Sequence, residues 1–352
     1  MSAQLLAPYP YFGGKRDIAP MIWSRLGRPK HYIEPFCGSC AVLLAAPEPA
    51  SLEVVGDANG FIANFWRATV HQPGEVARWA DYPVSHVDLG ARHGWLMDQR
   101  GVLGAELQDP NWPGNAKVAG WWLWGQCCWI GSGWCDWDKG ERRSKWDQRP
   151  HITTEGMGIH ARQRRREGDS GDGTGADVTS AGMPIQAAGK VPHVSDAGRG
   201  IQATGQVPHV GNADPCFWTS SGAVADRWLR QLAARLERVR VVHGDWSRCL
   251  NSHYGGDRTA IFFDPPYESF EGLYGVKKSV AQDVATWCRE NQGLAIALSG
   301  HVGDYDLPGW DAVQWERSGN TYSGSGTKDL EMIWFSPACL PAERPKQASL
   351  FV

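Results

Sequence analysis

The 352-residue sequence lacks any apolar run long enough to cross a bilayer, which excludes an integral membrane protein. Its start, MSAQLLAPYPYFGGK, lacks the basic residues and apolar core of a signal peptide, so we expect a cytoplasmic protein. Neither sign of charge dominates: the net charge is −3, so any nucleic-acid site must be a local patch. The nine cysteines are scattered and odd in number, which indicates reduced thiols rather than a disulfide framework.

The sequence does contain a regular alternation of strands and helices. Residues 31–70 have the pattern of strand, glycine turn, helix, strand and helix, and residues 219–267 resume it. A helix, a strand and an antiparallel edge hairpin are predicted to follow, at 279–290, at 294–298, and at 313–316 with 330–335. This alternation predicts a doubly wound, Rossmann-like α/β sheet that is largely parallel.

Polar or glycine-rich turns follow four of these strands, at Phe36–Cys40, Asp57, Asp245 and Asp264. Open α/β sheets bind ligands at the carboxyl ends of their strands. An acid at the second strand end, Asp57, can accept both hydroxyls of a ribose, which indicates a nucleoside-type cofactor. The last of these strands meets two prolines, which cannot continue a central sheet, so Asp264-Pro265-Pro266-Tyr267 is presented at its end.

In this order the turns resemble the motifs of the Dam-like, S-adenosylmethionine-dependent DNA adenine-N6 methyltransferases of the α group, which are phage or bacterial enzymes. The matching stretches are YFGGK (11–15), YIEPFCGS (32–39), VVGDAN (54–59), HGDW (243–246), DPPY (264–267), LSGH (298–301) and TKDLEMIWF (327–335). The resemblance implies a Rossmann-like methyltransferase sheet, double-stranded DNA as partner, and the cytoplasm of a bacterial host cell.

The resemblance also implies a set of residues that bind S-adenosyl-L-methionine as the methyl donor. Tyr11 and Lys15 would contact its methionine end, and Asp57 would bind its ribose hydroxyls. Asp245 would accept from its adenine amine, with Trp246 against the ring. The full set carried over is Tyr11, Lys15, Pro35, Phe36, Gly38, Ser39, Asp57, Asp245, Trp246 and Asp264.

The tetrapeptide Asp264-Pro265-Pro266-Tyr267 is the catalytic motif that the resemblance implies. The exocyclic amine of adenine is a poor nucleophile, because its lone pair is conjugated with the ring. Asp264 and the Pro265 carbonyl can accept its two N–H bonds, which favours a more nucleophilic nitrogen, and such fixed acceptors are preorganised for the developing charge. Tyr267 would stack on the base, which must be flipped out of the duplex to reach this site. No metal is expected.

The motifs divide the chain into three parts. Residues 1–70 and 219–336 are expected to form the catalytic domain, and residues 71–218 an inserted target-recognition region. Within the insertion, residues 150–215 are a low-complexity stretch in which Val-Pro-His-Val recurs after 16 residues. A tolerated loop expansion and a functional role explain this repeat about equally well.

Arginines and tryptophans in the insertion are candidates for DNA contact. We interpret the basic runs as phosphate contacts: Arg142, Arg143, Arg162, Arg164, Arg165 and Arg166. Six of the nineteen tryptophans fall within residues 121–137. We expect Trp121 to Trp124 to lie in the core. The glycine-flanked Trp129 and Trp134 are taken as candidates for facing DNA, with a core position equally open.

The cysteines near the motifs are not expected to bind metal. Cys37-Gly38-Ser39-Cys40 forms a CxxC in which Cys40 replaces the second loop glycine of the family, but no second ligand pair follows at usable spacing. We expect Cys40 to be a small residue packed at the helix start. The cluster of Cys127, Cys128 and Cys135 lacks a fourth ligand.

Residues 337–352 are expected to form a flexible tail, because three prolines disfavour a helix. The tail contains Gln347-Ala348-Ser349-Leu350-Phe351, which resembles the motif with which bacterial replication proteins bind the sliding clamp. In that resemblance Gln347 hydrogen-bonds in a small pocket, and Leu350 and Phe351 fill an apolar one. The alternative is that both apolar side chains fold back onto the enzyme's own surface.

Two further readings of the whole chain stay open. One is N4-cytosine or RNA adenine methylation, and the other is a catalytically silent DNA-binding protein of the same fold. Aspartate at 264, where cytosine-N4 enzymes commonly have serine, favours adenine. The presence of Asp264, Tyr267, Lys15 and Asp57 together argues against a silent protein.

Overall fold

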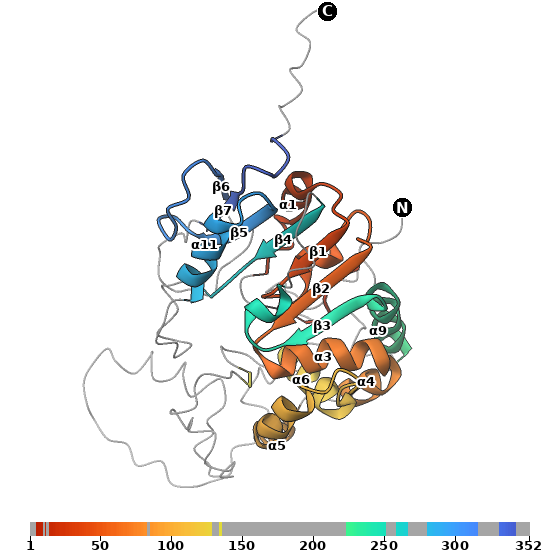
Figure 1. The fold of residues 1–352 in the computed structure, drawn as a ribbon. Coiled ribbons are helices and arrows are strands. Elements are labelled where there is room, and N and C mark those ends of the chain that lie inside the picture. Colours follow the sequence, from red (N-terminus) through yellow and green to blue (C-terminus); the bar gives the residue numbers. More distant parts are fainter. Residues whose placement is uncertain are drawn as a thin grey trace, which may run out of the picture.

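The computed structural model describes residues 5–9, 11, 14–82, 85–128, 134–135, 223–250, 258–266, 280–315 and 331–342. In these residues seven strands form one sheet in the order β3-β2-β1-β4-β5-β7-β6 (Figure 1). The strands are β1 (His31–Glu34), β2 (Leu52–Asp57), β3 (Val239–His243), β4 (Thr259–Phe263), β5 (Ala295–His301), β6 (Asp311–Trp315) and β7 (Glu331–Phe335). Strands β1 to β5 pair in parallel, and β7 runs antiparallel to β5 and β6. The predicted doubly wound sheet with an antiparallel edge is confirmed.

Helices connect and cover these strands. They are α1 (Ala19–Leu26), α2 (Ala41–Leu44), α3 (Gly60–His71), α4 (Pro73–Ala80), α5 (His86–Glu106), α6 (Ala116–Cys128), α9 (Ala223–Leu236) and α11 (Val280–Glu290). Side chains cap the starts of α3, α5 and α6: Asn59 accepts from the Phe61 amide, Ser85 from the Asp88 amide, and Asn115 from the Val118 amide. Every helix in the described part of the chain is too short or too polar to cross a membrane.

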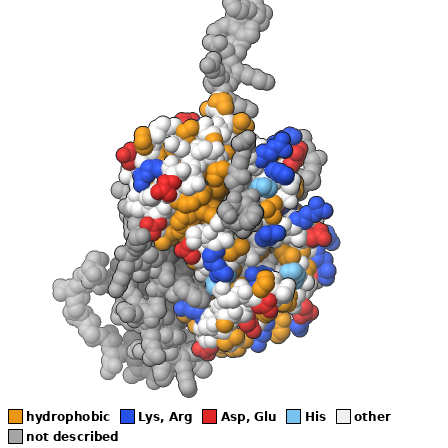
Figure 2. Space-filling model, in the orientation of Figure 1, with side chains coloured by type: hydrophobic (Ala, Val, Ile, Leu, Met, Phe, Trp, Pro, Cys, Tyr) orange, Lys and Arg blue, Asp and Glu red, His pale blue; other side chains and the backbone are white. Residues whose placement is uncertain are grey.

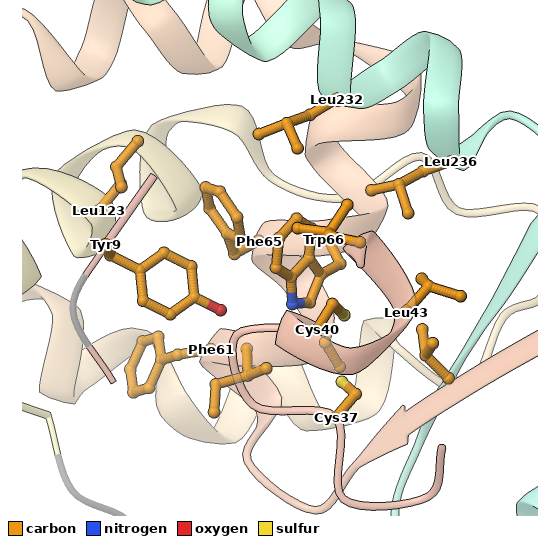
Figure 3. Packing of buried hydrophobic residues seen from close by; sticks show 14 of the residues in the cluster. Tyr9, Cys37, Cys40, Leu43, Phe61, Phe65, Trp66, Leu123, Leu232 and Leu236 are labelled. Carbon is orange, nitrogen blue, oxygen red and sulfur yellow. The ribbon is translucent and has the colours of Figure 1, made fainter. Parts of the chain in front are cut away.

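Successive side chains of the central strands are buried on opposite faces of the sheet. Tyr32 of β1 and Phe262 of β4 join a cluster with α1, α3, α6 and α9. Ile33 and Phe263, one residue further along each strand, join a second cluster with α11. Both faces are therefore covered, as expected for a parallel sheet. Figure 3 shows the first cluster, in which aromatic rings from α3 pack against leucines of α9.

Residues 121–128, the first part of the tryptophan-rich segment, lie in α6, which is apolar on almost every side. Trp122 is 1% exposed and Trp124 is 0% exposed, so the prediction that these residues lie in the core is confirmed. Helix α6 packs against α3 and α4, and α4 also packs against α9. Helices α4 to α6 belong to the predicted insertion. They share one hydrophobic core with α3, which precedes them, and α9, which follows the insertion.

The described surface carries mixed charge. Figure 2 shows acidic and basic side chains interspersed over the described part of one face, consistent with the net charge of −3. Several charged side chains are instead buried in pairs. Glu53 of β2, for example, is 2% exposed and binds the Arg235 guanidinium at 2.6 Å. A buried carboxylate of this kind needs such a partner, because desolvation penalises an isolated charge.

Candidate active site

The glycine-rich turn begins at Glu34, the last residue of β1. Glu34 is 2% exposed, and its Oε2 accepts hydrogen bonds from the Tyr32 hydroxyl at 2.9 Å and the Leu43 amide at 3.0 Å. The second bond ties α2 back to the strand that precedes it. Burial raises the pKa of Glu34 to about 8, although both hydrogen bonds act in the opposite direction. No motif in the sequence assigned a role to this residue.

Three side chains hold the next part of the turn, at Gly38. Its carbonyl accepts from the Tyr9 hydroxyl at 2.8 Å and from the Trp66 indole N–H at 2.9 Å, and its amide donates to Asp57 Oδ2 at 3.0 Å. The backbone at Gly38 has a φ of 43°. A Cβ atom there would lie 2.4 Å from the Tyr11 ring, so this position requires glycine. Figure 3 shows Tyr9 and Trp66 converging on the turn.

Cys40 ends the turn in the left-handed region, with a φ of 52°, and is the N-cap of α2. It is 0% exposed, which confirms the expectation of a small residue packed at the helix start. Burial raises the pKa of both Cys37 and Cys40, so these thiols stay protonated near neutral pH. Among the described residues there is no group of histidines, cysteines and acids that could hold a metal ion.

Asp57 closes β2 beside this turn. Its Oδ1 accepts from the Asn59 amide at 2.8 Å and its Oδ2 from the Gly38 amide at 3.0 Å. A carboxylate has about four lone-pair positions, so each oxygen keeps capacity for one more donor. Burial raises the pKa of Asp57 to about 6, and the two amide bonds oppose this rise. The side chain is therefore ionised at neutral pH and able to accept two hydroxyls.

The end of β3 lies next to Asp57, because the Gly244 amide donates to the Asp57 carbonyl at 3.1 Å. The exposed Asp245 caps the 3₁₀ helix η3 (Trp246–Cys249) by accepting from the Ser247 amide at 3.0 Å. The Trp246 ring meets the ring of Phe263 edge-on, with centroids 5.9 Å apart. Asp245 and Trp246 thus follow β3, and the end of this strand lies next to the end of β2, where Asp57 stands.

At the end of β4, Asp264 is bound by a lysine from the beginning of the chain. Lys15 Nζ lies 2.9 Å from Asp264 Oδ1 and 3.0 Å from Oδ2. The same ammonium lies 3.4 Å from Glu331 Oε2, at the start of β7. The Lys15 side chain is 2% exposed, so both carboxylates contact a buried charge. Asp264 itself is 21% exposed and remains accessible.

A pocket lies between the glycine-rich turn and Asp264. Its lining brings together five residues that the sequence predicted: Tyr11, Lys15, Phe36, Ser39 and Asp264. Glu34, Gly14, Cys37, Ala41, Val42 and Phe262 complete it. The structure therefore joins parts of the chain that are about 250 residues apart in one cavity. Four residues that hold this site were missed from the sequence: Tyr9, Glu34, Trp66 and Glu331.

Trp134 requires a correction. It was a candidate for facing DNA, but it is 3% exposed, and its indole N–H donates to the Trp122 carbonyl at 3.1 Å. Its ring lies over Gly125 of α6, where the lack of a side chain makes room for it. Other predicted residues lie outside the described residues, namely Tyr267, Trp129, the six arginines and the tail from Gln347 to Phe351.

Residues 11–83 match the family model of the D12 class N6 adenine-specific DNA methyltransferases. This segment of the chain is similar to that class of enzymes, and the match supports methylation of adenine N6 in DNA. The match covers α1 to α4, which includes the glycine-rich turn and Asp57, and it ends before the tetrapeptide at 264–267. No curated protein matches the chain. The predicted family, activity and DNA substrate are confirmed, and a methyl donor is required.

Proposed function

We propose that this D12 class enzyme uses S-adenosyl-L-methionine as its methyl donor and holds it along the ends of β1 to β4. The shape and donor set of the site support this assignment. The buried Gly38 stands in a turn that three side chains fix, and Asp57 keeps two lone pairs for a ribose diol. Tyr11, Lys15 and Ser39 line the neighbouring pocket and would contact the methionine end. When bound, S-adenosylmethionine supplies an electrophilic methyl group.

Asp245 and Trp246 would complete this site on the far side of Asp57. Asp245 is exposed and its Oδ1 binds Ser247, which leaves Oδ2 to accept from an adenine amine. Trp246 offers part of its ring beside that position. Pro35 and Phe36 would contribute the start of the turn.

The catalytic step rests on Asp264 and Pro265, because the chain leaves the sheet there, beside the pocket. In the proposed complex the Asp264 carboxylate and the Pro265 carbonyl accept the two N–H bonds of the target adenine amine. The amine nitrogen is thereby held with its lone pair turned toward the methyl group. Pro266 keeps the turn rigid, and Tyr267 stacks on the base. Fixed acceptors need no reorganisation as positive charge develops on the nitrogen.

The placement of Asp264 against the pocket is the observation that carries this proposal. Asp264→Ala should abolish methyl transfer to unmodified DNA while leaving the protein folded. Asp306→Ala, which removes an exposed acid elsewhere, is the matched control and should keep full activity. Turnover by Asp264→Ala within a few-fold of the parent enzyme would refute the catalytic role. Calorimetry on Asp57→Ala tests the ribose role separately, since cofactor affinity should fall.

DNA contact is proposed for residues 71–218, with the six arginines on phosphates. Access to double-stranded DNA would place the enzyme in the cytoplasm of a bacterial host cell.

The tail is proposed to bind the bacterial sliding clamp through Gln347, Leu350 and Phe351, which would raise the local concentration of enzyme on DNA. Fluorescence anisotropy of the labelled tail peptide against purified clamp tests this. Saturable micromolar binding, lost in Leu350→Ala with Phe351→Ala, is expected, and absence of saturation up to the high-micromolar range would refute it.

A further inference from the structure

Glu331 is a buried carboxylate for which the methylation chemistry gives no role. It begins β7, where it pairs with His301 of β5 on one side and Trp315 of β6 on the other. Its side chain is 7% exposed and lies 3.4 Å from Lys15 Nζ. Glu331 is not part of the pocket lining, whereas Lys15 and Asp264 both are. Its position therefore allows it to act on the pocket through Lys15.

The three charges form one connected group. Lys15 contacts both oxygens of Asp264, at 2.9 and 3.0 Å, and Glu331 Oε2 at 3.4 Å. A buried ammonium is costly unless carboxylates compensate its charge. Lysine also has a flexible four-carbon stem, so a single contact leaves its ammonium poorly fixed. A second carboxylate, on β7, which is paired on both sides, gives Lys15 a defined position.

Asp264 needs some lone pairs for its proposed work on the adenine amine. Lys15 already contacts both oxygens of Asp264, and without the pull of Glu331 its ammonium could shift along this carboxylate onto lone pairs that the adenine amine needs. Attraction by Glu331 from the other side opposes that movement. We propose that Glu331 is a positioning residue for methyl transfer, because it holds Lys15 at the distance that keeps Asp264 both oriented and available. This inference rests on the proposed catalytic role of Asp264.

Substitutions at Glu331 separate charge from packing. Glu331→Gln keeps the shape but removes the charge, and Glu331→Asp keeps the charge but shortens the side chain. A purely structural residue should tolerate glutamine better than aspartate, because aspartate leaves a small cavity. The positioning role predicts the reverse order for kcat. Displacements of about 1 Å in an active site can cost about 100-fold, so we expect Glu331→Gln to lower kcat by about 10- to 100-fold.

The decisive measurement is single-turnover methylation of a short duplex at saturating cofactor and DNA. For Glu331→Gln we also expect dissociation constants for cofactor and DNA within about threefold of the parent enzyme, since the contacts to both ligands remain. Glu53→Gln is the matched control, because it breaks another buried ion pair, with Arg235, at 2.6 Å. That control should lower the melting temperature without changing kcat.

Two results would overturn the proposal: a kcat for Glu331→Gln within twofold of the parent enzyme, or a kcat for Glu331→Gln above that of Glu331→Asp. If the glutamine variant does not fold, Glu331→Asp decides alone: the retained charge should preserve most of kcat, and a loss as large as the roughly 10- to 100-fold expected for glutamine, in a folded variant, refutes the positioning role. Failure of the underlying function is distinguishable, since Asp264→Ala would then stay active whatever Glu331 does.

Discussion

Replacing Gly125 of α6 by alanine should destabilise the protein strongly, although alanine is the better helix former. A Cβ atom at this position would lie 1.9 Å from two ring atoms of Trp134, which is less than any real contact allows. Because Trp134 is 3% exposed and bonded to the Trp122 carbonyl, the ring cannot shift slightly and must leave its site. Loss of a buried tryptophan costs about 3–5 kcal/mol. The higher helix propensity of alanine offsets about 1 kcal/mol of this cost. We therefore expect the free energy of unfolding to fall by about 2–4 kcal/mol.

Gly94 of α5 provides the matched control, because a Cβ atom there meets nothing within 4 Å. Gly94→Ala should therefore stabilise the protein by about 0.5–1 kcal/mol. Urea unfolding followed by circular dichroism gives both values. The loss at Gly125 should also disappear when Trp134 is alanine, since the clash has then been removed. If Gly125→Ala is as stable as the parent protein, Trp134 does not occupy this core position, and its assignment away from DNA is wrong.

Three further outcomes are expected. Burial raises the pKa of Asp57 to about 6. Cofactor affinity measured by calorimetry should therefore be constant above pH 7 and fall about tenfold per pH unit well below pH 6. An affinity that does not change with pH down to pH 5 would contradict the ribose role. Burial raises the pKa of Glu34 from 4.5 to about 8, so its contribution to stability is complete below pH 4.5 and is lost as the pH rises through 8, by up to about 1.4 kcal/mol per pH unit. Glutamine cannot ionise, so the free energy of unfolding of Glu34→Gln, measured in urea, should decline less between pH 6 and 9 than that of the parent protein. The same pH dependence in both proteins would refute the burial argument. Replacing the arginines at 162 and 164–166 should weaken binding to all DNA sequences alike and flatten its salt dependence, and an unaltered salt slope would exclude phosphate contact.

The sheet was predictable because its signals are local. Each strand of the parallel core is a short apolar run that ends at a polar or glycine-rich turn, and the predicted strands agree with β1 to β5 to within a few residues. The pocket followed from the same signals, since carboxyl ends of parallel strands share one edge. Cys40 was also placed correctly, because a helix start leaves room for a small side chain.

The missed and misplaced residues depend on contacts between distant parts of the chain. Glu331 is a lone acid in an apolar strand, and its partner Lys15 lies more than 300 residues earlier, so the sequence indicates burial without indicating a partner. Trp134 stands between glycines and cysteines that suggest an exposed turn. Its burial depends on the space above Gly125, which α6 provides only after it has packed.

The Lys15–Asp264 contact has a consequence for how the protein is made. Lys15 precedes Asp264 by 249 residues, which at 5–20 residues per second of synthesis is an interval of roughly 12–50 seconds. Strand β1 is likewise synthesised long before β4, its neighbour in the centre of the sheet. A nascent or truncated chain that ends before residue 259 therefore carries β1 with one open edge. Such edges pair readily with other chains, so premature termination of translation should yield aggregates rather than a fragment that competes for cofactor.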